Sequence, residues 1–247
     1  EKKRLKKEIS IKNENIIIWM SSLIIDDNSL TGKKPPEEII VKDRNAMPRE
    51  IPNDHPSLDL KKSLEFIFSN LEKGVTERGH HFHLLVLGTI DKDNKPQNRN
   101  VVLRKVDMAN SLIRFHTDIR SNKIIDIKNN SSISLLGYDK ANKLQIRLTA
   151  NAIIEESKEV LSDVWTKMYP MSRECYRVKD APGKVVASRD QVLFEDEGDD
   201  KLNGFENFVI INCHISSIET LFLHSAGHVR AKYIYENGAF NGEWLVP

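Results

Sequence analysis

The chain has 247 residues, of which 30% are charged and 39% hydrophobic, and its 37 basic residues nearly balance 36 acidic ones to give a formal net charge of +1. This composition is that of a globular protein of one or two domains, and the balanced charge argues against nucleic acid as a partner. Two distant cysteines exclude a disulfide framework and a four-thiolate zinc site and favour a reducing, cytoplasmic setting, and no apolar run is long enough to predict a membrane span.

The first part of the chain differs in composition from the rest. Residues 1–12 hold six basic and two acidic residues, which is typical of a solvated chain end, although an arm that binds anionic lipid or nucleic acid is the alternative. Five prolines between residues 28 and 56 indicate an extended connector. The sequence therefore predicts an N-terminal extension and proline-containing connector over residues 1–56 and one folded domain over residues 57–247.

The predicted domain begins with a helix. Ser57 is a good N-cap, apolar residues recur at helical spacing through Leu71, and Gly74 supplies the C-terminal stop. Another helix is predicted over residues 157–168, and an acidic loop that contains glycine follows over residues 195–204.

Strands make up most of the remaining pattern. The clearest alternation of apolar and polar residues covers residues 144–155. Similar alternation predicts strands over residues 83–90, 99–106, 112–117, 133–138, 208–223, 229–235 and 244–246. Because most of these strands are joined by tight turns and few helices alternate with them, we expect a mainly β fold with α, an antiparallel barrel with flanking helices, rather than a doubly wound parallel sheet.

A short helix is predicted over residues 121–129. Ser121 stands at its N-cap, and we expect Ile124, Ile125 and Ile127 to face inward. The start of this helix lies at the end of the most polar stretch of the domain.

Polar residues gather between the predicted strands and this helix. One strand carries Arg99 and Arg104, the next ends in Thr117, and the helix opens with Ser121 and Lys123. A helix N-terminus offers unpaired N–H groups and the positive end of the helix dipole, and hydroxyls and cations beside it suit a terminal phosphate. The spacing predicts a phosphate-ligand site, and a capped helix with solvated cations is the alternative.

Several short motifs follow one another along the domain in a fixed order and at set distances. They are Arg99-Asn100-Val101-Val102-Leu103-Arg104, Phe115-His116-Thr117-Asp118, Arg120-Ser121-Asn122-Lys123, Leu144-Gln145-Ile146-Arg147, Ile218-Glu219 and Gly227-His228-Val229-Arg230-Ala231-Lys232. Together they resemble the pyridoxamine 5′-phosphate oxidase family over residues 57–247. The resemblance is closer to a subgroup described mainly as FMN-binding than to the vitamin-B6 enzyme.

This resemblance implies a split antiparallel β-barrel that forms a homodimer, with FMN as cofactor in the cleft between the subunits. It implies that Gln145 reaches the flavin from the other subunit and that a late basic residue near the flavin is Arg230 or Lys232. The cofactor-binding residues that it implies are Arg99, Asn100, Val101, Val102, Leu103, Arg104, His116, Thr117, Ser121, Asn122, Lys123, Gln145, Arg230 and Lys232.

The sequence also departs from the family's pattern. Asn122 replaces an arginine of the phosphate cradle, and Leu221 stands near the position of a tryptophan beside the flavin. In the region that holds the substrate phosphate of the vitamin-B6 enzyme, Tyr169 stands in place of an arginine and Arg173 in place of a serine. FMN binding therefore carries over better than the pyridoxine-phosphate substrate does.

We thus expect an FMN-dependent oxidoreductase that acts on an unidentified small molecule, with no membrane or nucleic-acid partner and with no catalytic side chain assigned. The alternatives are a true pyridoxamine or pyridoxine 5′-phosphate oxidase and a non-catalytic module that binds flavin or haem. His80, His81 and His83 are clustered, as in a transition-metal site, but their alternation with apolar residues favours the polar face of a strand entering the sheet, so no metal is expected.

Overall fold

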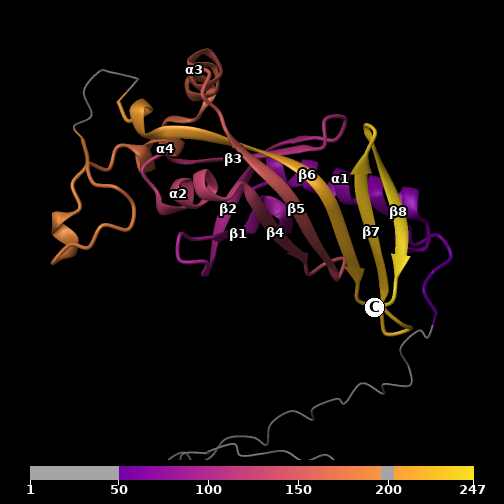
Figure 1. Ribbon diagram of the computed structural model, residues 1–247. Helices are drawn as coiled ribbons and strands as arrows, with labels where there is room; N and C mark the ends of the chain where they lie inside the picture. The colour runs from indigo at the N-terminus through magenta and orange to yellow at the C-terminus, as the bar shows by residue number, and fades with distance from the viewer. Residues whose placement is uncertain (1–49, 196–202) are drawn as a thin grey trace, which may run out of the picture. The chain divides into compact units, whose positions relative to one another are not determined.

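The computed structural model describes residues 50–195 and 203–247 (Figure 1). All described residues belong to one compact unit, which begins at Met47. The predictions made for residues 1–49 and for the acidic residues 196–202 fall outside this description. No helix in the described ranges is long and apolar enough to span a membrane.

Eight antiparallel strands build one sheet whose order is β3-β2-β1-β4-β5-β6-β7-β8. An additional pairing between β3 and β6 closes six of the strands into a barrel, while β7 and β8 continue the sheet beyond it (Figure 1). The strands are β1 (Leu84–Ile90), β2 (Pro96–Asp107), β3 (Leu112–Asp118), β4 (Ser132–Asp139), β5 (Leu144–Ile154), β6 (Phe208–Phe222), β7 (Val229–Glu236) and β8 (Ala239–Leu245). The predicted split barrel is confirmed.

Helices flank the strands of the sheet. They are α1 (Leu60–Thr76), α2 (Asn122–Asn129), α3 (Lys158–Lys167) and α4 (Pro170–Arg173). The described residues also contain short 3-10 turns at Pro56–Leu58, His81–His83, Glu174–Tyr176, Arg189–Gln191 and Phe205–Asn207. Helix α1 packs on β2, β8 and the turn at residues 81–83, α2 packs on β1, and α3 packs on β6.

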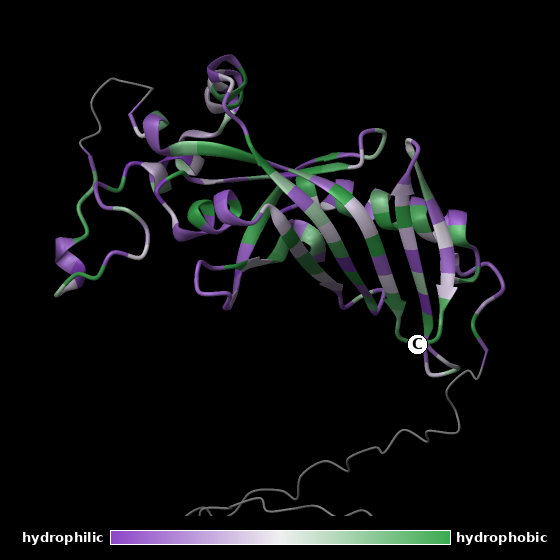
Figure 2. Cartoon of the chain, in the orientation of Figure 1, coloured by the Kyte–Doolittle hydropathy of each residue, from purple (hydrophilic) through white to green (hydrophobic). Residues whose placement is uncertain are grey.

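The core forms because inward residues of the strands alternate with polar outward ones, as Figure 2 shows along β5, β6 and β7. On β5 the inward residues Leu144, Ile146 and Leu148 are buried. Apolar side chains from α1 and α2, such as Ile67 and Ile124, complete the same cluster.

Helix α1 corrects two predictions about its ends. Asp59 rather than Ser57 is the N-cap, and its carboxylate accepts a hydrogen bond from the N–H of Lys62 at 2.8 Å. Gly74 lies inside the helix and not at its end. A Cβ atom built on Gly74 would lie 2.7 Å from the carbonyl oxygen of Phe82, so close backbone approach accounts for the glycine.

The histidine-rich stretch before β1 is a 3-10 turn and not the start of a strand, which corrects the prediction for His81 and His83. Nδ1 of His83 lies 2.7 Å from the carbonyl oxygen of Gly74, and His80 stands at the N-cap of the turn, where its Nδ1 accepts the N–H of Phe82. The residues of this turn are thus held by hydrogen bonds between histidine side chains and the backbone rather than by strand pairing.

Helix α2 begins after Ser121 as expected, but its inward face differs from the prediction. Ile124 and Ile127 are buried, whereas Ile125 is 53% exposed and Asp126 takes the inward place. The sequence pattern predicted that the apolar Ile125 would be buried. In the structure Asp126 is buried instead, because its carboxylate accepts hydrogen bonds from Thr89 and Arg99.

The segment between β5 and β6 lies outside the barrel. Phe208 and Ile210 at the start of β6 point away from the main core and pack in a second cluster with Trp165 of α3 and with Tyr176. Arg120 ties the same segment to the barrel, because its guanidinium donates to the carbonyl oxygens of Val178 at 2.9 Å and Lys179 at 3.0 Å.

Candidate functional site

A polar network lies where α2 closes the barrel. The carboxylate of Asp126 accepts a hydrogen bond from the Thr89 hydroxyl at 2.7 Å and one from Nη2 of Arg99 at 3.3 Å. Nη1 of Arg99 donates to the Thr89 hydroxyl oxygen and, at 3.2 Å, to the carbonyl oxygen of Gln97. Strands β1 and β2 and helix α2 thereby fix the guanidinium at the end of the barrel.

Lys123, in the first turn of α2, makes a second group of hydrogen bonds. Its Nζ donates to the hydroxyl oxygens of Thr117 at 2.8 Å and Ser121 at 3.0 Å. The Ser121 hydroxyl donates to the carbonyl oxygen of Asp118 at 2.7 Å and makes no capping bond to the helix. We call the set Arg99, Thr117, Ser121 and Lys123 the basic cradle.

The electrostatics of the basic cradle favour an anion. Burial lowers the pKa of Lys123, and the charge of Arg99 lowers it further, although Asp118 and Asp126 oppose this. Two cations near a helix N-terminus repel each other, and an anion bound between them would relieve this repulsion and stabilise both charges. The structure places Lys123 in hydrogen-bond contact with Thr117 and Ser121 and within electrostatic reach of Arg99.

Arg104 and His116 lie apart from the basic cradle. The pairing of β2 with β3 shifts its register at Arg104, and this side chain is exposed. His116 packs edge-on against Phe208, with ring centroids 5.1 Å apart. Burial, followed by the charges of Arg104 and Arg114, lowers the pKa of His116 to about 3, so the three groups are neighbours.

Four further predicted residues lie on the outer face of the sheet. One register row across seven strands contains Asn100, Val86, Leu136, Arg147, Glu219, Lys232 and Glu243. The row two residues along contains Tyr138, Gln145, Leu221, Arg230 and Leu245. These two rows, the outer rows below, hold Gln145, Arg230 and Lys232 close together on β5 and β7.

An ion group crosses the outer rows. Oε1 of Glu219 accepts bonds from Nη1 of Arg147 at 3.1 Å and from Nε of Arg230 at 3.0 Å. The Arg230 guanidinium adds a second bond through Nη2. Glu219 therefore fixes Arg230 against the sheet.

The predicted residues thus form separate groups on one chain. Asn100 lies on β2 and Lys232 on β7, and these strands are five steps apart through β1 and β4 and three steps apart through β3 and β6. Val101 and Leu103 are buried in the core, so their side chains cannot reach a ligand, while Asn122 is exposed at the first turn of α2.

Two members of the buried network were not predicted from the sequence. Thr89 is 2% exposed and Asp126 is 4% exposed, and they lie 37 residues apart in the chain. A carboxylate three residues after Lys123, on the side of α2 that carries Ile124 and Ile127, is the signal that could have identified Asp126.

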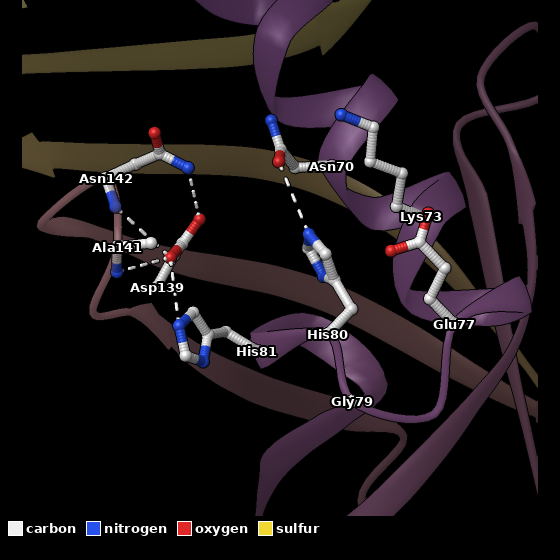
Figure 3. A pocket seen from close by; sticks show the side chains of 9 residues that line it. All are labelled: Asn70, Lys73, Glu77, Gly79, His80, His81, Asp139, Ala141 and Asn142. Atoms are coloured by element: carbon white, nitrogen blue, oxygen red, sulfur yellow. Dashed lines mark hydrogen bonds and ion pairs between the residues drawn. The ribbon is translucent and has the colours of Figure 1, made fainter.

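A second polar site lies at the other end of β1 and β4 (Figure 3). This pocket of about 540 Å³ is lined by residues of α1, of the histidine turn and of the β4–β5 turn, among them His80, His81 and Asp139. Nε2 of His81 lies 3.5 Å from Oδ1 of Asp139, and Nε2 of His80 lies 3.4 Å from Oδ1 of Asn70. Within the described ranges, no three side chains are grouped as metal ligands.

The closed six-strand barrel with flanking helices defines a split-barrel protein, and the basic cradle lies at the end of this barrel where α2 begins. Residues 65–156 match the family model described as pyridoxamine 5′-phosphate oxidase, FMN-binding domain. This part of the chain is therefore similar to the pyridoxamine 5′-phosphate oxidase-like family. A search of curated protein sequences finds no match.

Solved structures share the fold. A pyridoxamine 5′-phosphate oxidase-related, FMN-binding protein from Nostoc punctiforme has a TM-score of 0.63 and 20% identity over 74% of this chain and 96% of that chain. PhzG from Burkholderia lata, solved in complex with tetrahydrophenazine-1-carboxylic acid, has a TM-score of 0.58 and 16% identity over 85% of this chain and 98% of that chain.

Proposed function

We propose that this protein binds FMN and is an FMN-dependent oxidoreductase acting on a small molecule. The observation that carries the proposal is the convergence of Arg99 and Lys123 at the N-terminus of α2. The family model described as FMN-binding, which covers both residues, supports the same assignment.

The basic cradle fits a flavin phosphate. A terminal phosphate carries about −1.5 to −2 charge at neutral pH, opposite in sign to the charges of Arg99 and Lys123. The Ser121 side chain makes no capping bond, so N–H groups of the first turn of α2 are left to the phosphate. Thr117 adds a buried hydroxyl beside them.

A second copy of the chain would complete the site. Gln145, Arg230 and Lys232 lie on the outer rows, several strands from β2 along the sheet. One flavin that meets the basic cradle of one subunit and these three side chains of the other needs a homodimer. Exposed Leu136 and Tyr138 on the same face, at 40% and 47%, supply apolar area for that contact.

FMN would supply the acceptance and donation of electrons, and the chain would hold it and shape access to it. The substrate region argues against pyridoxine phosphate. Nη2 of Arg173 donates to the carbonyl oxygens of Thr166 and Met168, each at 2.9 Å, so its guanidinium is engaged at the end of α3. Tyr169 is 74% exposed and supplies no second cation there.

The test of FMN binding is a double variant, Arg99→Ala with Lys123→Ala. The wild-type protein is expected to show a flavin absorption spectrum and to release FMN, identified by mass, on heating. The double variant is expected to lose the flavin while keeping its far-UV circular dichroism, because it removes two charge-assisted bonds of about 1.5–3 kcal/mol each.

Lys128→Ala is the matched control, because Lys128 is an exposed cation on the same helix, away from the basic cradle. This variant is expected to keep its FMN. A double variant that purified with full FMN would contradict the cradle assignment. A wild-type protein that is colourless and takes up no added FMN would contradict the proposed function itself.

A further inference from the structure

Arg99 has a fixed anionic partner behind it. Asp126 lies on the buried side of the guanidinium, with its side chain 6% exposed, while that of Arg99 is 23% exposed. A guanidinium has five N–H donors, and Arg99 makes three hydrogen bonds within the described residues. Its remaining donors are available to a ligand on the open side.

Without Asp126, nothing in this network would hold the guanidinium by charge. Lys123 lies near enough for the charge of Arg99 to affect its titration, so the two cations repel each other. An arginine side chain can swing into water on its exposed side when no anion retains it. The Thr89 hydroxyl has one proton, which it donates to Asp126, and it therefore accepts from Arg99.

We propose that Asp126, with Thr89 as a bridge, is the positioning residue that presents the Arg99 guanidinium to a phosphate ester and so gives the site its preference for phosphorylated flavin; this rests on the proposed function. Asp126 touches no ligand in this arrangement and acts through Arg99. In this proposal Arg99 contacts only the phosphate of the flavin, so the affinity for a flavin without phosphate does not depend on Asp126 or Thr89.

The experiment compares FMN with riboflavin, measured by quenching of flavin fluorescence on the full chain. Asp126→Asn keeps an acceptor for the Thr89 hydroxyl and removes the charge. It is expected to weaken FMN binding about tenfold and to change riboflavin binding by less than about twofold. Thr89→Val is expected to act in the same direction, and Thr89→Ser, which restores the hydroxyl, is expected to recover the wild-type preference.

Asp139→Asn is the matched control. Asp139 is also a buried carboxylate, 1% exposed, and it accepts bonds from the Asn142 side chain and the Ala141 N–H (Figure 3). Because it lies at the other end of β1 and β4, this variant reports the general cost of losing a buried charge. It is expected to leave the FMN-to-riboflavin ratio unchanged.

A second readout uses no flavin. The rotation of the Arg99 guanidinium, followed by NMR and assigned with Arg99→Lys, is expected to be slow in the wild type and faster in Asp126→Asn. Unchanged rotation would overturn the proposal, and so would faster rotation with an unchanged FMN-to-riboflavin ratio. A wild type that shows no preference for FMN would overturn the proposed function, while the rotation still decides whether Asp126 holds Arg99.

Discussion

His116 on β3 is a polar side chain held among apolar and cationic neighbours. Its Nδ1 is buried and meets no hydrogen-bond partner among the described residues. Burial, together with the charges of Arg104 and Arg114, lowers its pKa to about 3 from an ordinary value of 6.5. The folded protein therefore holds this imidazole neutral at pH values where the unfolded chain binds a proton.

We expect the stability of the fold to decrease as the pH falls from 6.5 towards 3. In that window only the unfolded state protonates His116, so this group alone lowers the free energy of unfolding by about 1.4 kcal/mol per pH unit. Urea unfolding at a series of pH values measures the slope for the wild type and for His116→Phe, which keeps a ring against Phe208.

The difference between the two proteins isolates His116. His55 and His224, whose pKa values are also lowered by burial, titrate in both proteins and cancel in the comparison. If the free energy of unfolding changed with pH in the same way for wild type and variant, the pKa of His116 would not be lowered by burial as described.

At the residue scale, the sequence pattern singled out the residues of the basic cradle but not the residues that support them. Arg99, Ser121 and Lys123 belong to motifs in which a phosphate explains their chemistry. Thr89 and Asp126 come together only through the pairing of β1 with β2 and the packing of α2 on β1. No local pattern contains that contact, and the apolar Ile125 beside Asp126 directed the prediction to the wrong side chain.

Helix α1 depends on a close contact with the histidine turn. The carbonyl oxygen of Gly74 lies 2.7 Å from Nδ1 of His83, and the backbone of Phe82 passes over the same residue. The glycine that the sequence pattern predicted as the helix end is therefore a point of close approach between the helix and the turn at residues 81–83.

Gly74→Ala is expected to destabilise the fold by about 1–3 kcal/mol, although alanine is the better helix former. The added Cβ would meet backbone atoms of Phe82 at 2.7 and 2.8 Å, and these atoms cannot move independently of the turn. Urea unfolding measures the change. Gly79→Ala is the control, since no atom lies within 4 Å of its Cβ, and it should stay within about 0.5 kcal/mol. A stabilised Gly74→Ala would contradict the close approach.

The elements that the sequence predicted well are those with a strong local signal. β5 alternates without interruption, and its predicted and observed bounds nearly coincide. β8 was predicted only over residues 244–246 but covers Ala239–Leu245. Its middle residues Asn241, Gly242 and Glu243 have weak strand preference, and pairing with β7 holds them extended.

At the scale of the whole molecule, the outer rows present charge and apolar area on one face. The carboxylate of Glu219 joins two guanidiniums there, and Leu136 and Tyr138 are exposed next to them. An apolar patch bordered by fixed charges is typical of a protein interface. The face therefore supports the homodimer proposed for the complete flavin site.

Leu136→Asp is expected to weaken self-association at least about tenfold, because it places a charge in the centre of that face. Sedimentation velocity at several concentrations measures the association, and flavin content measured on the same samples should fall with it. Met108→Asp is the control, at a residue 43% exposed in the β2–β3 turn. A monomeric wild type that holds full FMN would show that one chain forms the site alone.

The segment between β5 and β6 leaves the barrel and returns to it at neighbouring positions. The N–H of Glu155 donates to the carbonyl oxygen of Ile210 at 2.9 Å, so the two ends of residues 156–207 are already joined by the ladder that carries β5 onto β6. Arg120, one residue before Ser121 of the basic cradle, also holds this segment by hydrogen bonds to the carbonyl oxygens of Val178 and Lys179. Insertions, deletions or replacement in this segment need not displace any barrel strand. The sequence of this segment can therefore change, and with it the surface on this side of the barrel, while the end of the barrel that carries the basic cradle stays the same.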